Sequence, residues 1–333
     1  MTKNLYFPPM PHTVAFLVYP GFQLLDASGP ASVFTEANHA LKERRRDAFY
    51  AIEMVSSLGG LVTSGGGIAL QTRALSDMPA AGIGTLLVSG GDAESLRAAI
   101  ADPAVRHWTP RCAEMAERFG SVCSGTFLLA ALGLLNGRRV ATHWEACTQL
   151  AKLYPSVTVD PDTLYVADGK VWTSAGVTTG IDMALAMVGQ DIDATIAGSV
   201  AKRLVLYARR PGYQSQFSAL LNAQVKADSP FADLIGWMQE NLDRPLDVPS
   251  LAARAGLSER SFYRRFLAEI GQSPARFVEA IRLDAARMLL SRKLPLKTIA
   301  AQVGLSPASR LTEAFERRFG VTPRLFREMH SGL

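Results

Sequence analysis

The chain has 333 residues, enough for about two domains of ordinary size, and 48% of its residues are hydrophobic. No stretch approaches the roughly 18 uncharged apolar residues of a membrane-spanning helix, and the first residues lack the apolar core of a secretion signal. The three cysteines are too few for a disulfide framework. We therefore expect a cytoplasmic protein without membrane span or disulfides.

Positive charge is concentrated in the last third of the chain. The whole sequence carries 35 Lys and Arg against 30 Asp and Glu, a net charge of +5. Residues 231–333 hold 16 of the basic and 11 of the acidic side chains, which leaves 19 of each in the first 230 residues. A basic domain joined to a neutral body suggests a polyanionic partner. A mildly basic solvated surface would give a similar count.

Strand and helix patterns alternate over the first two thirds of the chain. Short apolar runs predict buried strands, periodic apolar positions predict helices, and Asp168-Gly169 predicts the turn of a hairpin. Alternation of this kind predicts a flavodoxin-like α/β domain, with a mostly parallel sheet and helices on both faces. The predicted strands are 13–19, 50–56, 85–89 and 121–123, the predicted helices are 28–41, 103–119, 128–132, 179–188 and 194–208, and a hairpin turn is predicted at 63–67.

Four small or reactive residues follow predicted strands. Asp26, Gly90, Gly91 and Cys123 each come just after an apolar run. Ligands of open α/β sheets bind beyond the carboxyl ends of the strands. These residues can therefore meet in one crevice, although they are far apart in the sequence.

Cys123, in S-V-C-S-G-T-F, is a candidate reactive thiol. A thiol becomes nucleophilic when its pKa falls, for example at a helix N-terminus or beside a base. Ser124 and Gly125 would direct backbone N–H groups to the same space, as an oxyanion site requires, and His143 and Asp26 are the candidate base and acid. A free cysteine is also commonly a small buried hydrophobe, as we expect for Cys112 and Cys147. His12 and His107 have no partner identifiable from sequence, and no metal-ligand spacing or phosphate loop predicts a metal or cofactor.

The last hundred residues contain an internal repeat. L-A-A-R-A-G-L-S at 251–258 matches I-A-A-Q-V-G-L-S at 299–306, and the match resumes downstream at an offset of 49. In each copy a short helix ends at a glycine (Gly256, Gly304), and a second helix with apolar residues at i and i+4 follows. This is the pattern of a helix-turn-helix, whose second helix enters the major groove of DNA. The alternative is a plain helical bundle with a solvated basic surface.

The tail resembles the AraC/XylS-type DNA-binding domain. The resemblance rests on L-A-A-R-A-G-L-S-E-R-S-F-Y-R-R-F with G-Q-S-P, on R-L-D-A-A-R-M-L-L, and on I-A-A-Q-V-G-L-S with F-E-R-R-F-G-V-T-P-R-L-F-R. It implies double-stranded promoter DNA as the partner. Glu313 departs from the family, where an arginine is common, so we rely more on the first unit for base reading. The base-contacting positions that it implies are Arg260, Tyr263 and Arg264 in the first unit and Ser309, Arg310, Thr312 and Glu313 in the second.

Residues 12 to about 190 resemble the ThiJ/PfpI superfamily, with the glutamine-amidotransferase-like fold. The motifs are Y-P-G-F-Q-L-L-D-A-S-G-P-A-S-V-F, V-S-G-G, V-C-S-G-T-F-L-L-A-A-L-G-L-L-N-G-R-R-V-A-T-H-W and T-S-A-G-V-T-T-G-I-D-M-A-L. The family's reactive cysteine, histidine and acidic neighbour map to Cys123, His143 and Asp26. Ser124, where the protease-like branch has histidine, argues against peptidase chemistry. The whole chain resembles GlxA-type AraC-like regulators, which implies a homodimer and a small-molecule effector.

Three functions are compatible with these patterns. The first is a DNA-binding transcription regulator whose effector, a small nitrogenous metabolite, binds near Asp26, Gly90, Gly91, Cys123, Ser124, Gly125 and His143. The second is a cysteine-dependent hydratase or amidase, similar to isonitrile hydratases, with an attached DNA-binding domain. The third is a redox sensor using Cys123. The expected domains are residues 10–208 for sensing and dimerisation, 209–230 as a linker, and 231–329 for DNA binding.

Overall fold

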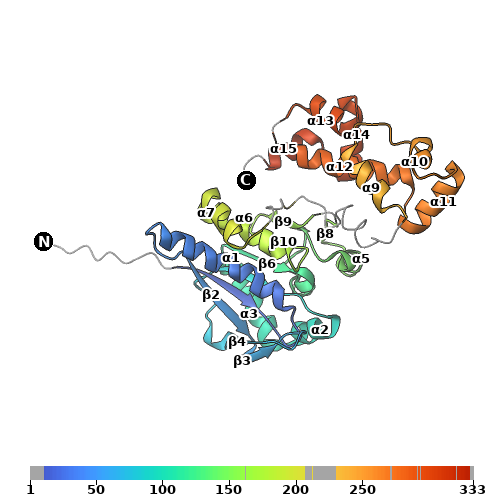
Figure 1. The fold of residues 1–333 in the computed structure, drawn as a ribbon. Coiled ribbons are helices and arrows are strands. Elements are labelled where there is room, and N and C mark those ends of the chain that lie inside the picture. Colours follow the sequence, from blue (N-terminus) through green and yellow to red (C-terminus); the bar gives the residue numbers. More distant parts are fainter. Residues whose placement is uncertain are drawn as a thin grey trace. The chain divides into compact units, whose positions relative to one another are not determined.

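The computed structural model describes residues 11–161, 163–206, 212, 230–270, 272–290, 292, 294–319 and 321–330. Two compact units divide the chain, residues 1–216 and residues 217–333 (Figure 1). Most of the predicted linker lies outside the described residues, so the predicted domain boundaries stay a prediction. No helix in the described part of the chain is long and apolar enough to cross a membrane.

The first unit is built on an eight-stranded sheet in the order β3-β4-β2-β1-β5-β6-β10-β9. In this order, the six strands β4, β2, β1, β5, β6 and β10 run parallel to one another. The outer pairs β3–β4 and β9–β10 are antiparallel hairpins. β7 (Arg139–Val140) and β8 (Thr158–Val159) form a separate short pair. The strands of the main sheet are β1 His12–Leu17, β2 Tyr50–Ser56, β3 Leu58–Thr63, β4 Ala69–Ala74, β5 Ile83–Val88, β6 Arg118–Val122, β9 Tyr165–Asp168 and β10 Val171–Ser174.

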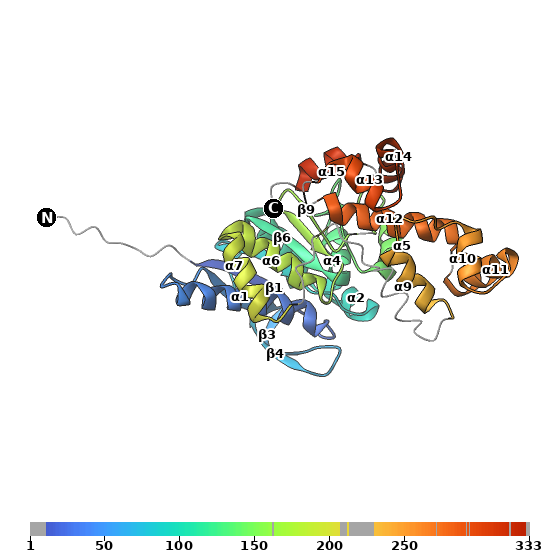
Figure 2. The same cartoon turned by 45° about the horizontal axis from the view of Figure 1, so that its top comes forward.

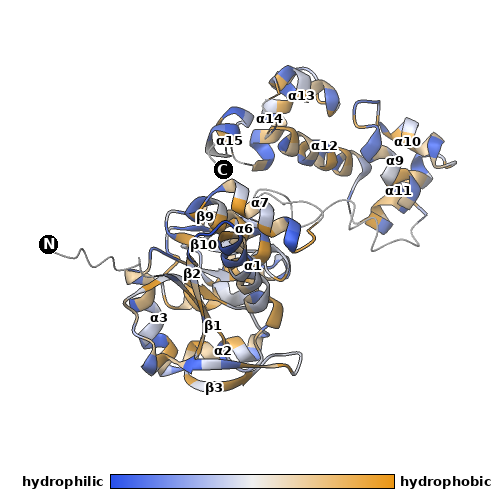
Figure 3. Cartoon of the chain, turned by 60° about the vertical axis from the view of Figure 1, so that its left-hand side comes forward, coloured by the Kyte–Doolittle hydropathy of each residue, from blue (hydrophilic) through white to orange (hydrophobic). Residues whose placement is uncertain are grey.

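Helices cover both faces of this sheet (Figures 1 and 2). α1 (Leu24–Glu43), α6 (Thr179–Asp191) and α7 (Ala194–Arg203) pack against one another on one face. α2 (Ala93–Ala101), α3 (Pro103–Met115) and α4 (Thr126–Ala131) pack on the other, and α5 is Trp144–Leu153. Figure 3 shows β1 coloured as apolar, because a central parallel strand is buried on both faces.

The predicted fold class of the first unit is confirmed, but several element boundaries were wrong. α1 begins at Leu24 rather than Ser28, which places Asp26 in its first turn. The predicted helix 103–119 ends at Met115, because residues 118–122 are a strand buried at every position between β5 and β10. α7 ends at Arg203 rather than continuing to 208. The hairpins at 63–67 and Asp168-Gly169 were correctly predicted.

The second unit is helical, and its helices recur in the same order in two copies. α10 and α13 are offset by 48 residues, whereas α11 and α14, and the first residues of α12 and α15, are offset by 49. Gly256 (φ 65°) and Gly304 (φ 67°) both adopt the left-handed backbone that ends the first helix of each copy. The helices are α9 Ala232–Glu240, α10 Val248–Arg254, α11 Glu259–Ile270, α12 Pro274–Leu290, α13 Leu296–Gln302, α14 Ala308–Phe319 and α15 Pro323–His330.

Candidate functional site

Asp26 joins three segments at the carboxyl ends of the strands. It is fully buried, and its two carboxylate oxygens accept hydrogen bonds from the backbone N–H groups of Gly90 (2.9 Å) and Val177 (2.9 Å). Gly90 follows β5 and Val177 follows β10, so the carboxylate holds two loops that are far apart in the sequence. Burial raises the pKa of this carboxyl to about 6, although both N–H donors oppose the rise.

Cys123 occupies a strained turn directly after β6. Its φ of 59° lies in the left-handed region, which a non-glycine residue rarely adopts. Gly176 (φ 99°) lies against it so closely that an added Cβ would come within 2.2 Å of the Cβ of Cys123. A Cβ on Gly90 would similarly come within 2.9 Å of that atom. The two glycines therefore allow loops from β5 and β10 to close around the thiol.

The surroundings of Cys123 keep its thiol protonated. Burial, together with the negative charge of Asp26, raises the pKa of the thiol to about 12, and hydrogen bonds from Ser124 only partly oppose this. A thiolate nucleophile needs the opposite shift, from a nearby cation or base. The hydroxyl of Ser124 also donates to the carbonyl of Gly91 (2.8 Å) and accepts from its N–H (3.1 Å), so Ser124 mainly fixes the neighbouring loop. Gly125 lies against β5, where an added Cβ would meet the carbonyl of Val88 at 2.4 Å.

His143 lies beside this site rather than on the thiol. Its neighbour Thr142 donates a hydrogen bond to the carbonyl of Cys123 (2.9 Å). The imidazole Nδ1 of His143 is 3.8 Å from Glu145, and its ring lies against Trp144 with centroids 5.5 Å apart. Within the described part of the chain, no hydrogen bond joins this imidazole to the thiol. The structure thus brings the other six predicted residues together, whereas the contacts of the predicted base are with Glu145 and Trp144.

Three contributors to this site, Gly176, Val177 and Tyr19, were not predicted from the sequence. Gly176 and Val177 lie in the quoted T-S-A-G-V-T-T-G motif, yet the pairing of Val177 with Asp26 spans 151 residues. Val177 has a φ of 48°, which is a costly conformation for a β-branched residue. In the sequence, its position directly after a glycine is the one sign of an unusual backbone there. The buried hydroxyl of Tyr19 donates to the carbonyl of Ser89 (2.8 Å), and burial raises its pKa well above the usual value.

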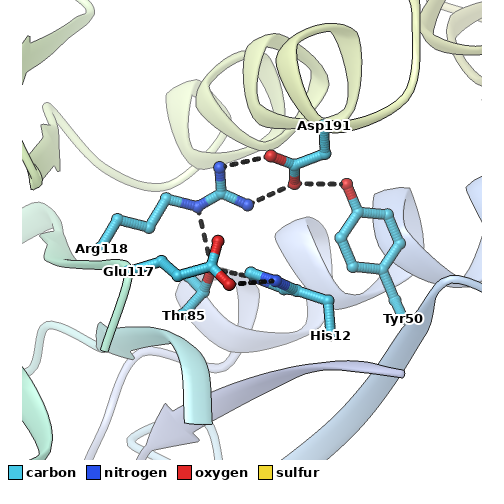
Figure 4. Close-up of polar contacts among 6 residues, drawn as sticks. All are labelled: His12, Tyr50, Thr85, Glu117, Arg118 and Asp191. Carbon is cyan, nitrogen blue, oxygen red and sulfur yellow. Dashed lines mark hydrogen bonds and ion pairs between the residues drawn. The ribbon is translucent and has the colours of Figure 1, made fainter. Parts of the chain in front are cut away.

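A second polar cluster lies at the amino ends of the strands, opposite Cys123 (Figure 4). Arg118 forms a two-pronged ion pair with Asp191 at the end of α6, one of its bonds being 2.7 Å, and Tyr50 donates to the same carboxylate at 2.7 Å. The Nε of Arg118 donates to Thr85, which also bonds the Nε2 of His12 at 2.7 Å. The partners of His12, which could not be identified from the sequence, are therefore Thr85 and its neighbours in this cluster.

The predicted DNA-contacting residues of the first unit lie on α11. Arg260, Tyr263 and Arg264 are exposed, whereas Phe262 and Phe266 are fully buried on the opposite side of the same helix. The hydroxyl of Ser258 caps α11 by accepting from the N–H of Ser261 (3.3 Å). This helix can therefore present guanidinium groups and an aromatic ring to a groove while its core face stays packed.

The equivalent residues of the second unit lie on α14 but offer different chemistry. Ser309, Arg310 and Glu313 are exposed. Thr312 is half-buried, and its hydroxyl donates to the carbonyl of Ala308 (2.9 Å) within the helix. Leu311 and Phe315 are fully buried, as the repeat predicts.

Known proteins resemble both units of the chain. Residues 12–190 match the DJ-1/PfpI family, and residues 251–329 match a helix-turn-helix domain. The chain is 28% identical over 309 residues to the HTH-type transcriptional regulator CdhR of Pseudomonas aeruginosa, covering 92% of this chain and 89% of that protein. It is also 28% identical over 313 residues to the HTH-type transcriptional regulator GlxA of Rhizobium meliloti, covering 93% and 94%. The predicted resemblance to GlxA-type regulators is confirmed.

One similar protein is an enzyme. The isonitrile hydratase of Pseudomonas putida is 29% identical over 204 residues, which cover 61% of this chain and 81% of that protein. The two regulators, in contrast, match over more than nine tenths of this chain.

Proposed function

We propose that this chain, which belongs to the DJ-1/PfpI family and carries a helix-turn-helix domain, is a sequence-specific DNA-binding transcription regulator that responds to a small molecule. The observation that carries this proposal is the repeat of the second unit, in which equivalent helices recur at offsets of 48 and 49 residues. Each copy exposes one face of its second helix and buries the other. Promoter DNA is then the partner, and the cytoplasm is where the protein acts.

Binding to promoter DNA is the first test. The full-length protein should prefer the promoter region upstream of its own gene over random duplex, and the affinity should fall steeply with salt because neutralised phosphates release counterions. No salt-sensitive preference in an equilibrium binding assay would rule the regulator out.

Arg264→Ala tests the role of α11. If the guanidinium of Arg264 contacts a base, its loss reduces discrimination between operator and random DNA by about 1–3 kcal/mol. Arg324→Ala is a matched control, because Arg324 is an exposed arginine of α15, outside the recognition helices α11 and α14, and pairs with Glu328. Equal weakening on every sequence would make Arg264 a phosphate contact instead.

The proposed effector site is the region around Asp26 and Cys123 at the carboxyl ends of the strands. The chemistry of the site supports a nitrogenous, cationic effector, because a positive charge near Asp26 would offset a buried carboxylate that is held only by neutral N–H donors. Strained backbone at Cys123 and Val177 also concentrates there, as it does at functional sites. Binding of the effector would change how the protein presents its DNA-binding units.

Thermal-shift measurements on the full chain test this site. Amines and betaines should raise the unfolding temperature more than neutral amides do, since a ligand that binds only the folded state stabilises it. Asp26→Asn should abolish the preference for cations and leave any response to neutral amides. A cation response that survives this substitution would place the effector elsewhere.

A cysteine-dependent hydratase or amidase is the second candidate, favoured by the similarity to isonitrile hydratase. The raised pKa of Cys123 disfavours it, because the thiol is protonated at neutral pH. We propose that the thiol recognises a ligand rather than transforms one. Turnover of small isonitriles, nitriles or amides that disappears in Cys123→Ala would establish the enzyme instead.

We also propose that the protein acts as a homodimer, on the basis of its resemblance to GlxA-type regulators. Two copies would present four helix-turn-helix units to one operator. Sedimentation equilibrium of the full chain at micromolar concentration should give twice the mass of the monomer. A monomer at these concentrations would contradict the proposal.

A further inference from the structure

Arg264 and Glu313 occupy the same position in the two repeated units. α11 begins at Glu259 and α14 at Ala308, so both residues are the sixth of their helix. Both side chains are exposed, and each lies two residues after a fully buried apolar residue that fixes the rotation of its helix, Phe262 or Leu311. The repeat therefore presents the two side chains to DNA in equivalent geometry.

The chemistry at this shared position is opposite in the two units. A guanidinium only donates hydrogen bonds, whereas a carboxylate at neutral pH only accepts them. In the major groove, guanine offers two acceptors, O6 and N7, and cytosine offers the N4 amino group as donor. Arg264 thus suits guanine, and Glu313 suits cytosine.

The charges around the two positions differ as well. On α11, Arg260, Arg264 and Arg265 are exposed and make no ion pair within the described residues. On α14, Arg317 pairs with Glu279 and Arg318 pairs with Asp284, both on α12.

Of the α14 side chains that remain, Arg310 is positive, and Glu313 and Glu316 are exposed carboxylates. Two of the three arginines of α14 are thus held in ion pairs, so the second recognition helix attracts a phosphate backbone less strongly than the first. A carboxylate kept at such a surface reduces affinity unless it accepts a hydrogen bond from a base.

We infer that the two helix-turn-helix units contact different bases at their equivalent positions. Arg264 contacts guanine, which accepts hydrogen bonds, and Glu313 contacts cytosine, which donates one. This inference rests on the proposed DNA-binding function. The operator is then not a direct repeat at these positions. The first unit supplies most of the electrostatic affinity, and Glu313 supplies discrimination at a cost in affinity.

Selection of operators from a randomised duplex library, with the full-length protein, tests this inference. Wild-type protein should select a guanine under the first unit and a cytosine under the second. Glu313→Gln should weaken the cytosine preference about 5- to 150-fold, the range of a good base contact, and tighten binding to random duplex. Glu313→Arg should exchange that cytosine for guanine and leave the first half-site unchanged.

Glu316→Gln is the matched control, because it removes the same charge from an exposed site one turn further along α14. It should tighten binding to all sequences and leave base preference unchanged. If Glu313→Gln behaves like Glu316→Gln, the carboxylate of Glu313 contacts no base. That result would refute this inference but not the proposed function as a transcription regulator. If wild-type protein selects no sequence at all, the proposed function falls with it.

Discussion

The two ends of the parallel sheet each hold an aspartate, and the two aspartates have opposite kinds of partner. At the amino ends of the strands, Asp191 faces the guanidinium of Arg118 and the hydroxyl of Tyr50. At the carboxyl ends, Asp26 has only two neutral N–H donors, and burial raises its pKa to about 6. The first end pairs its carboxylate with a cation, whereas the second holds its carboxylate with neutral donors alone.

Two of the four non-glycine residues with positive φ in the described part of the chain lie at the carboxyl ends of the strands. Cys123 and Val177, both with positive φ, flank Asp26, whereas the backbone of His12, Thr85 and Arg118 is ordinary strand. Strain and an uncompensated charge both cost stability, so they persist where function requires them. These differences fit a stabilising role for the amino end and the ligand-binding role that we propose for the carboxyl end.

Removal of Arg118 should have the largest effect on stability. Arg118→Ala leaves the carboxylate of Asp191 buried without its cation, and loss of one partner of a buried pair costs about 3–5 kcal/mol. Arg73→Ala is the control, because Arg73 pairs with Glu53 at 3.1 Å on the surface, where such pairs contribute about 0–1 kcal/mol. Urea unfolding of both variants measures the difference. Similar losses would show that the Arg118 pair is not structural.

Asp26 should make the native state less stable as the pH rises. Its folded pKa of about 6 lies above the ordinary aspartate pKa of 3.8, so the folded protein retains a proton that the unfolded chain releases. The stability contributed by the protonated form is complete below about pH 4 and is lost as the pH passes through about 6. The loss is about 3 kcal/mol.

The difference in unfolding free energy between wild type and Asp26→Asn isolates this titration from those of other carboxyls. It should fall over that pH range and then level off. Asparagine adds a constant offset, because its amide cannot accept from both Gly90 and Val177. Parallel pH curves for the two proteins would mean that Asp26 is not destabilised by burial.

The sequence predicted the fold class and the carboxyl-end site better than the amino-end cluster. Asp26, Gly90 and Cys123 follow apolar runs, and strand topology alone brings such residues together. The partners of His12 could not be predicted, because they depend on strand order and on where β6 begins. No residue between Met115 and Phe119 breaks the helical pattern. Burial between β5 and β10 makes residues 118–122 a strand.

The close packing of Gly176 against Cys123 should lower the unfolding free energy of an alanine variant beyond the effect of its positive φ. Gly176→Ala would place a Cβ within 2.2 Å of Cys123, whereas nothing lies within 4 Å of a Cβ added at Gly67. Both glycines have positive φ, so Gly67→Ala reports the conformational cost alone. Gly176→Ala should lower the unfolding free energy by about 1–3 kcal/mol more, the cost of overpacking. Equal losses would show that the loop after β10 can move away from the thiol.

His12 should give the smallest effect, with the opposite pH dependence to that of Asp26. Burial, and then the positive charge of Arg118, lowers its pKa below 6.5, while Asp191 and Glu117 partly oppose the shift. The unfolded chain therefore takes up the proton first, so stability is complete above about pH 6.5 and falls as the pH drops below it.

His12→Gln should remove this loss. Glu117→Gln should deepen it, because Glu117 lies 3.8 Å from the imidazole. Urea unfolding between pH 5 and 8, roughly the range in which histidine titrates, measures both variants. If the loss of unfolding free energy at low pH persists in His12→Gln, it arises from the titration of another group, and His12 does not stabilise the fold through this cluster.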